Sequence, residues 1–332
     1  MAFKDVLGHS MPVELLQRAI RTDKVVHSYL FVGNEGIGKK RVALQFAKAL
    51  NCLKRSADTG GDACDQCLSC RKIQEGVHPD VLLLEPENQT IKVDQVRQMQ
   101  RDLAYRPYEG KRRVCILAAA DRMAPNMSNI LLKTLEEPPI HTVIVLLANN
   151  PKLLLPTIVS RCQSVRFHPL PVPLVASWLS EQQGMGKEEA HLLASLSEGS
   201  PGKALELQEE IRQIPRGDLL GKWLGRGKLS FEEMERWAES MPSDREDLIS
   251  ILEVAKTLLR DLVVIKMLKD GSRLIHSDLQ GEMADIASRL RLSNLLHRIR
   301  LIHQTLLDIS PIRGNANTRL ALEAMMLSWP EG

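Results

Sequence analysis

A glycine-rich loop between a strand-like run and a helix-like stretch is the feature that most constrains the fold of this chain. The loop reads GNEGIGKK, after an apolar run at 27–32 and before a helical pattern at 39–50. In this context the motif G-x-x-x-x-G-K-[ST] cradles phosphates with backbone amides and a lysine, while the last hydroxyl binds magnesium. A lysine replaces that hydroxyl, so we predict a degenerate nucleotide-binding loop formed by Gly33, Gly36, Gly38, Lys39 and Lys40. A tight turn without any ligand is the alternative.

The end of a second strand-like run lacks the acidic residues that a working ATPase needs. The run RVCIL at 113–117 is followed by Ala118 and Ala119, at the positions where carboxylates hold magnesium and orient the attacking water. Asp121 comes about three residues late, and we expect it at the surface or as a helix N-cap. Both halves of the magnesium site are therefore changed, so ATP hydrolysis is not expected, and ATP binding by the loop is doubtful.

Apolar runs alternate with helical patterns in the first half of the chain, which predicts an α/β domain with a parallel sheet and helices on both faces. The expected strands are 27–32, 81–84, 113–117, 142–148 and 164–167, and the expected helices include 39–50, 93–103 and 126–136.

After Leu170 the strand pattern ends, and Pro171 and Pro173 mark a linker into helical sequence. We expect a nucleotide-binding-type domain at 1–169, an all-α lid at 170–210 and an all-α bundle at 211–332. Apolar spacing predicts helices at 173–183, 187–197 and 248–262, and another long helix from Leu290 to Leu306.

Four cysteines gather in one short segment. Cys52, Cys64, Cys67 and Cys70 follow the spacing C-x11-C-x2-C-x2-C, which lets four thiolates converge on one tetrahedral zinc ion. A closed shell of four thiolates has no open coordination position, so we expect one structural Zn²⁺ in an insert at about 52–70. Disulfides or unrelated buried thiols are the alternative, although a reducing cytosol disfavours disulfides. We expect Cys115 in the core.

Composition excludes some classes of function. Lys and Arg total 44 against 41 Asp and Glu, and only 4% of residues are aromatic. This balance argues against a protein whose main role is to bind nucleic acid through a basic, stacking surface. The sequence shows no secretory signal pattern and no apolar run of about 18 residues, so we expect a cytoplasmic protein without membrane association.

The triplet Ser160-Arg161-Cys162 follows a proline-containing turn after the strand-like run at 142–148. On residue type alone, an arginine at such a loop tip is a solvated charge or an ion-pair partner. Its planar guanidinium also suits a phosphate on a neighbouring molecule. Spacing alone does not decide between these roles.

Together these motifs resemble one family over essentially the whole chain. FKDVLGH at 3–9, HSYLFVGNEGIGK, the cysteine insert, HPD at 78–80, LLKTLEEPP at 131–139, SRC and NANTRLALEAMMLSW at 315–329 are similar to the delta prime family of bacterial DNA polymerase III clamp-loader subunits. The resemblance implies an AAA+ protein: a RecA-like domain with a zinc insert, a helical lid and a helical collar for oligomerisation. It also implies a place in a hetero-pentamer with gamma/tau-type ATPase subunits and delta, which loads the beta sliding clamp onto primed DNA as part of the polymerase holoenzyme.

Within this family the resemblance implies a stator that is inactive as an ATPase. ATPase sisters carry Thr after the loop lysine, Asp-Glu after the second strand and a lid arginine at the position of Gly202, for which Lys203 is a weak substitute. The resemblance further implies that Arg161 acts as an arginine finger in trans on the ATP of an adjacent subunit.

Two other functions stay open at this point. An active ATPase motor subunit would use Lys39 for ATP and Asp121 for the metal, and a zinc-ribbon nucleic-acid binder would rest on the cysteines alone. We also hypothesise that Arg122 and Lys133 approach DNA phosphates in the assembled ring.

Overall fold

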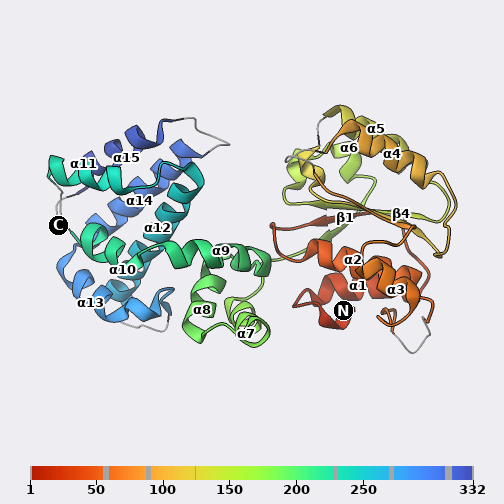
Figure 1. Cartoon of the computed structure of the whole chain (residues 1–332), viewed down its shortest axis with the longest axis horizontal. Coiled ribbons are helices and arrows are strands. Elements are labelled where there is room, and N and C mark those ends of the chain that lie inside the picture. Colours follow the sequence, from red (N-terminus) through yellow and green to blue (C-terminus); the bar gives the residue numbers. More distant parts are fainter. Residues whose placement is uncertain are drawn as a thin grey trace. The chain divides into compact units, whose positions relative to one another are not determined.

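The structure is a computed structural model that describes residues 2–54, 60–86, 91–123, 125–226, 230–268, 273–310 and 316–330 (Figure 1). Asn315 of the C-terminal motif lies outside these residues. The chain divides into two compact units. The first comprises Met1–Trp178 with Glu198–Lys203, and the second comprises Leu179–Ser197 with Ala204–Gly332.

The first unit contains a five-stranded sheet in the order β2-β3-β4-β1-β5, and every pairing is parallel. The strands are β1 (Ser28–Val32), β2 (Val81–Leu84), β3 (Arg113–Leu117), β4 (Thr142–Ala148) and β5 (Gln163–Arg166). All five predicted strands are confirmed, with shifts of one residue at the start of β1 and at both ends of β5. The register places Tyr29 opposite Val145 on one side and Gln163 on the other.

Helices cover both faces of this sheet, as Figure 1 shows. Phe31 points into the core on the side of α1 and α2, whereas its neighbour Leu30 points into the core on the side of α4 and α5, as alternation along a strand requires. One face carries α1 (Ser10–Arg21), α2 (Lys39–Asn51) and α3 (Leu68–Gln74), and the other carries α4 (Val93–Leu103), α5 (Pro125–Glu136) and α6 (Pro156–Val159). The predicted α/β fold class is confirmed.

Short helical turns lie at η1 (Phe3–Asp5), η3 (Ala120–Arg122) and η4 (Pro151–Leu153). Two longer helices, α7 (Val172–Gln183) and α9 (Pro201–Gln213), contribute residues to both units. None of the helices in the described ranges combines the length and the apolar character that crossing a membrane requires.

The described residues of the second unit form helices and connecting loops, without a strand. It contains α8 (Lys187–Leu196), α10 (Arg216–Asp218), the π-helix η5 (Leu219–Leu224), α11 (Phe231–Ser240), α12 (Arg245–Leu268), η7 (Ser277–Leu279), α13 (Gln280–Arg289), α14 (Leu292–Ile309) and α15 (Thr318–Leu327). The long helix predicted from Leu290 is wrong at its start. Leu290 is the extended C-cap of α13, and α14 begins two residues later.

A buried arginine among tryptophans organises the core of this helical unit. The Trp223 ring lies 4.4 Å from Trp237 and 5.3 Å from Trp329, measured between ring centroids. Arg298 is fully buried beside Trp329 and donates to the carbonyl of Leu224 at 2.7 Å. Burial lowers the pKa of Arg298 to about 10. Its guanidinium therefore fixes backbone carbonyls inside an aromatic core.

Candidate functional site

The glycine-rich loop connects β1 to α2 at the carboxyl end of the sheet, and its lysine is engaged within the chain. Lys39 Nζ donates to the carbonyls of Gly33 at 2.5 Å and Asn34 at 2.7 Å, and to Asn149 Oδ1 at 2.9 Å. An ammonium group has three donors, so these acceptors use all of them. A phosphate would have to displace at least one of these acceptors to reach the Lys39 ammonium.

Acidic side chains surround this lysine. Burial lowers the pKa of Lys39 to about 8, and the carboxylates of Asp121 and Glu35 oppose this shift. Glu35 also pairs with Arg122 at 3.0 Å and accepts a bond from Asn149 Nδ2 at 3.3 Å. The positive and negative side chains around the glycine-rich loop therefore compensate one another at the position where a phosphate would bind.

Two glycines hold the loop against the segment 198–203 of the same unit. Gly36 has a φ of +70°, and the Gly202 N–H donates to the Gly36 carbonyl at 2.9 Å. A Cβ on Gly202 would lie 2.8 Å from the Gly36 Cα, so no side chain fits there without a backbone shift. Ser200 Oγ adds a bond to the Glu35 carbonyl at 2.6 Å. The position implied to carry a lid arginine in ATPase sisters is therefore packed directly on the loop.

At the positions that bind magnesium in a working ATPase, this chain has Lys40, Ala118 and Ala119. Lys40 Nζ reaches Glu85 Oε1 at 2.7 Å, and both side chains are exposed. Ala118 follows β3 and donates its N–H to the Leu84 carbonyl at 2.9 Å, while Ala119 adopts a left-handed φ of 51°. Neither alanine offers an oxygen ligand from its side chain, and magnesium prefers oxygen ligands.

Asp121 has a role that the sequence analysis missed. Its Oδ2 accepts the N–H groups of Asn149 and Asn150, each at 2.9 Å, and so binds the backbone that leaves β4. The expected N-cap role is wrong, because Ala119 is the N-cap of η3. Asn149 was also missed, although its position directly after the fully buried strand β4 places it at the carboxyl edge of the sheet.

Arg161 lies at the opposite edge of the sheet from the glycine-rich loop. It precedes β5, and Ser28 Oγ at the start of β1 donates to its carbonyl at 2.7 Å. The loop begins after the other end of β1, so the backbone of Arg161 and Gly33 are separated by about 20 Å, given a rise of about 3.3 Å per residue. Arg161 therefore cannot serve the loop of its own chain.

The guanidinium of Arg161 is held by two groups. Nη2 pairs with Glu136 Oε1 at 2.8 Å, and Nη1 donates to the Thr157 carbonyl at 3.0 Å. The Arg161 side chain keeps 37% of its surface exposed, and that of Glu136 keeps 50%. The group is oriented and remains accessible to another molecule.

The four predicted cysteines come together between α2 and α3. Their sulfur atoms all lie within 4.8 Å of one another, and none of the four forms a disulfide. A tetrahedral zinc at about 2.3 Å from each sulfur needs sulfur separations of about 3.8 Å, which this cluster approaches. The four residues are Cys52, Cys64, Cys67 and Cys70. Their arrangement fits one metal ion and leaves no position for a substrate.

Backbone amides point at two of the sulfur atoms in this cluster, while burial raises the pKa of Cys52 and of Cys70. The Cys64 N–H points at Cys52 Sγ at 3.5 Å, and the Cys67 N–H points at Cys64 Sγ at 3.3 Å. Burial opposes ionisation of Cys67, but hydrogen bonds from the backbone of Cys70 and Leu53 and from neighbouring thiols bring its pKa down to about 6. Burial raises the pKa of Cys115 to about 12, as expected for a thiol in the core.

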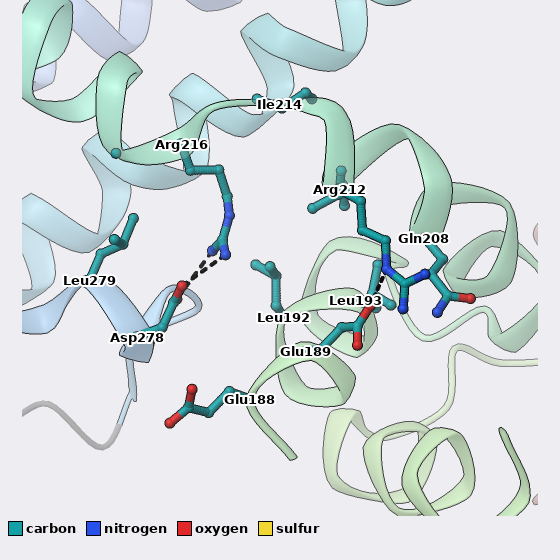
Figure 2. Close-up of a pocket in the computed structure, with 12 residues that line it drawn as sticks. Glu188, Glu189, Leu192, Leu193, Gln208, Arg212, Ile214, Arg216, Asp278 and Leu279 are labelled. Atoms are coloured by element: carbon teal, nitrogen blue, oxygen red, sulfur yellow. Dashed lines mark hydrogen bonds and ion pairs between the residues drawn. The ribbon is translucent and has the colours of Figure 1, made fainter. Parts of the chain in front are cut away.

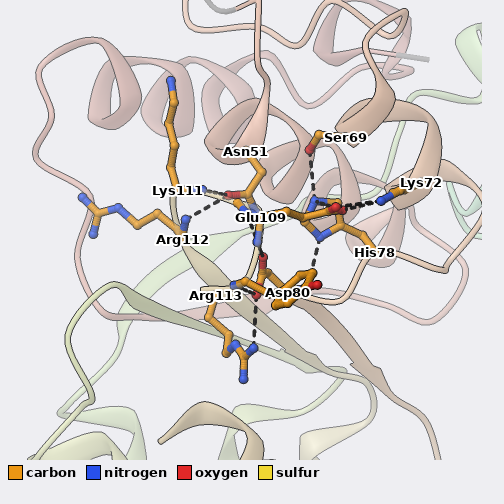
Figure 3. Close-up of polar contacts among 11 residues, drawn as sticks. Asn51, Ser69, Lys72, His78, Asp80, Glu109, Lys111, Arg112 and Arg113 are labelled. Atoms are coloured by element: carbon orange, nitrogen blue, oxygen red, sulfur yellow. Dashed lines mark hydrogen bonds and ion pairs between the residues drawn. The ribbon is translucent and has the colours of Figure 1, made fainter. Parts of the chain in front are cut away.

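A buried polar network ties a surface loop to the sheet (Figure 3). The carboxylate of Asp80 is fully buried and accepts the N–H groups of Tyr108, Glu109 and Gly110 at 2.7 to 2.9 Å. It also pairs with Arg113 at 3.1 Å. Burial alone would raise the pKa of Asp80, but these amides and the guanidinium hold it below its ordinary value.

The same loop is fixed at its second half by Asn51. Its Oδ1 accepts the N–H groups of Lys111 and Arg112, each at 2.9 Å. A Cβ on Gly110 would lie 2.7 Å from that oxygen, so only glycine fits. The carboxylate of Asp80 and the side-chain oxygen of Asn51 thus hold the five successive amides of residues 108–112. On this loop the side chain of Tyr108 is 81% exposed.

The network continues to α3, the helix that contains Cys70. The Asp80 N–H donates to His78 Nδ1, so the neutral ring carries its proton on Nε2 and donates to Ser69 Oγ at 3.1 Å. Burial lowers the pKa of His78, which favours this neutral form. Lys72 adds an ion pair to Glu109 at 2.7 Å. Ser69 and Lys72 flank Cys70 on α3, so the insert and the loop are mechanically connected.

The second unit contains a pocket of about 510 Å³ that the sequence did not predict (Figure 2). Leu192 and Leu193 of α8 are among its apolar lining residues. Arg216 pairs with Asp278 at 2.8 Å, and Arg212 pairs with Glu189 at 2.9 Å. Both arginines are neutralised, so the pocket presents no uncompensated cation to an anionic ligand.

Comparisons with known proteins agree with the motifs. Residues 8–171 match the family model described as DNA polymerase III, delta subunit. The chain is 30% identical to DNA polymerase III subunit delta' of Bacillus subtilis, over 96% of this chain and 95% of that protein. It is 40% identical to the delta' subunit of Pseudomonas aeruginosa over 58% of this chain and 60% of that protein. It is 28% identical to subunit tau of Escherichia coli over 90% of this chain, but the match spans only 44% of tau.

We expect Asp80→Asn to destabilise the first unit by about 3 kcal/mol, because it leaves the buried Arg113 charge without its counterion. The folded-state pKa of Asp80 is lowered, so its stabilising contribution is fully present above pH ~4 and declines as the pH falls through that lowered value. Urea unfolding of the variant and the parent at pH 7 and at about pH 2, where the Asp80 contribution has declined, measures both effects. An equal loss from Asp94→Asn, on the exposed first turn of α4, would contradict this account.

We expect the purified chain to hold one zinc per molecule and Cys67→Ser to hold none. Loss of the metal should also speed hydrogen exchange at amides 108–112, because Ser69 and Lys72 connect α3 to that loop. Metal analysis and hydrogen-exchange mass spectrometry provide the two measurements. Cys162→Ser, outside the cluster, is the control, and equal metal loss in this variant would show that the cluster is not the site.

Proposed function

This chain belongs to the delta prime family of DNA polymerase III subunits, and we propose that within the clamp loader it is a stator that hydrolyses no ATP itself. One observation carries the proposal. Arg161 is oriented at one edge of the sheet, while the degenerate loop lies at the other edge with Lys40 at the magnesium position. The only triphosphate within the reach of such an arginine belongs to another subunit.

The state of the loop supports the absence of hydrolysis. Magnesium would meet the Lys40 ammonium where a hydroxyl is needed and the methyl groups of Ala118 and Ala119 where carboxylates are needed. The rival motor function needs Asp121 as a metal ligand; its Oδ2 accepts two backbone amides, which leaves only the buried Oδ1 for a metal. ATP binding by the loop would require Lys39 to give up at least one of its three acceptors.

The chemistry supplied by this chain is charge stabilisation across an interface. An arginine finger neutralises negative charge that builds on the transferred phosphoryl group, and in related phosphoryl-transfer enzymes it is worth about 10³ to 10⁵ in rate. In this proposal Arg161 contacts the γ-phosphate in the site of a gamma/tau-type neighbour. Its fork geometry allows two parallel hydrogen bonds to phosphate oxygens.

The proposed assembly follows from the family. We place the chain in a hetero-pentamer with gamma/tau-type ATPase subunits and delta, which opens the beta clamp and sets it on primed DNA. Residues 1–169 would form the AAA+ module, 170–210 the lid and 211–332 the collar. A single structural zinc would hold the insert, and Arg122 and Lys133 are proposed to approach DNA phosphates.

We expect Arg161→Ala to lower ATP turnover of the reconstituted complex while assembly stays intact, because only the neighbour's site loses its trans cation. Steady-state ATP hydrolysis and size-exclusion chromatography measure turnover and assembly. Arg166→Ala, an exposed arginine at the other end of β5, is the matched control and should change neither.

The same assay separates the stator from the motor. The isolated chain should show no ATP hydrolysis in the presence of magnesium. Turnover by the chain alone that Lys39→Ala abolishes would support the motor function instead.

A further inference from the structure

The end of α5 carries two carboxylates at an unfavourable place. Glu136 and Glu137 lie at the carboxyl end of the helix, where the aligned peptide dipoles leave partial negative charge. Pro138 and Pro139 prevent the helix from continuing and keep both carboxylates at this end. Carboxylates at this end of a helix are unfavourable unless a positively charged side chain lies close to them.

Arg161 compensates one of the two glutamates. α5 and α6 pack side by side on one face of the sheet (Figure 1), and Arg161 lies two residues after the end of α6. Its Nη2 pairs with Glu136 Oε1 at 2.8 Å, whereas no ion pair involves Glu137 among the described residues. Only one of two adjacent, chemically identical side chains therefore contacts the arginine.

The ion pair with Glu136 orients the guanidinium of Arg161 and leaves most of its N–H donors free. One donor of Nη2 goes to Glu136 and one of Nη1 goes to the Thr157 carbonyl at 3.0 Å. A guanidinium has five N–H donors, so three remain for a phosphate. The backbone is fixed as well, because the nearly fully buried Ser28 donates to the Arg161 carbonyl. Glu136 thus limits the rotation of a side chain whose backbone is already anchored.

We propose that Glu136 is a positioning residue for Arg161, which holds the guanidinium in the orientation that meets the neighbour's phosphate. This inference rests on the proposed function, because it assigns Glu136 a role only if Arg161 acts in trans. Glu136 does not itself contact nucleotide. Its carboxylate reduces the conformational freedom that Arg161 would otherwise lose when the phosphate binds.

The solvent exposure of Glu136 and Arg161 sets the expected size of the loss in kcat. Both side chains are partly open to solvent, so the pair is screened and contributes as exposed ion pairs do. We expect Glu136→Ala to lower kcat of the reconstituted complex about two- to five-fold, the range that such pairs correspond to. KM for ATP should stay within about twofold, because the neighbour's own loop binds the nucleotide.

Two further variants separate positioning from a general effect on the helix. Glu136→Gln keeps a carbonyl oxygen that accepts from Arg161, so it should restore at least half of the lost kcat. Glu137→Ala removes the same charge from the same helix end without touching Arg161, and it should leave kcat unchanged. Thermal unfolding of each variant controls for folding, and Glu136→Gln remains informative if Glu136→Ala does not fold.

The outcomes are distinguishable. If Arg161→Ala leaves turnover unchanged, the proposed function fails, and the role of Glu136 fails with it. If Arg161→Ala lowers turnover but Glu136→Ala matches Glu137→Ala, only the positioning role is overturned. An increase of kcat in Glu136→Ala would also overturn it, because the carboxylate would then be masking the arginine.

Discussion

The common direction of the five strands is the constraint on which the rest of the first unit depends. Because every pairing is parallel, the carboxyl ends of all strands meet at one edge and the amino ends at the other. Lys39, Asp121 and Asn149 therefore converge at the carboxyl edge, although they are far apart in sequence. Arg161 precedes a strand and so lies at the opposite edge. A chain built this way presents its own loop on one side and its arginine on the other.

The carboxyl edge retains the shape of a phosphate site but satisfies its charges internally. Lys39 binds carbonyls and Asn149, Lys40 binds Glu85, and Glu35 pairs with Arg122. Each of these contacts has to be weakened before a triphosphate and its metal can occupy the edge.

The sequence predicted what depends on local pattern. The strand ends of β2, β3 and β4, the junction of loop and α2 and the convergence of four cysteines all follow from alternation, glycine placement and short spacing. It did not predict contacts that join distant segments. The bond of Asp121 to the backbone after β4 and the pairing of Glu136 with Arg161 depend on strand order, which spacing along the chain does not encode. The long helix expected from Leu290 failed because apolar spacing continues across a break that only backbone conformation shows.

The cysteine insert acquires a physical role from its place beside the buried carboxylate of Asp80. The four-cysteine cluster includes Cys67 and Cys70 at the start of α3, and that helix supports His78 through Ser69 and Glu109 through Lys72. His78 in turn accepts from the amide of Asp80, whose carboxylate holds three successive amides of the loop that carries the exposed Tyr108. Each contact is buried or anchored on a helix, so these contacts connect the cysteine cluster to the amino-terminal end of β3. Arg161 precedes β5 at the same edge of the sheet, so the contacts of the cysteine cluster and of Arg161 both reach the side that faces away from the glycine-rich loop.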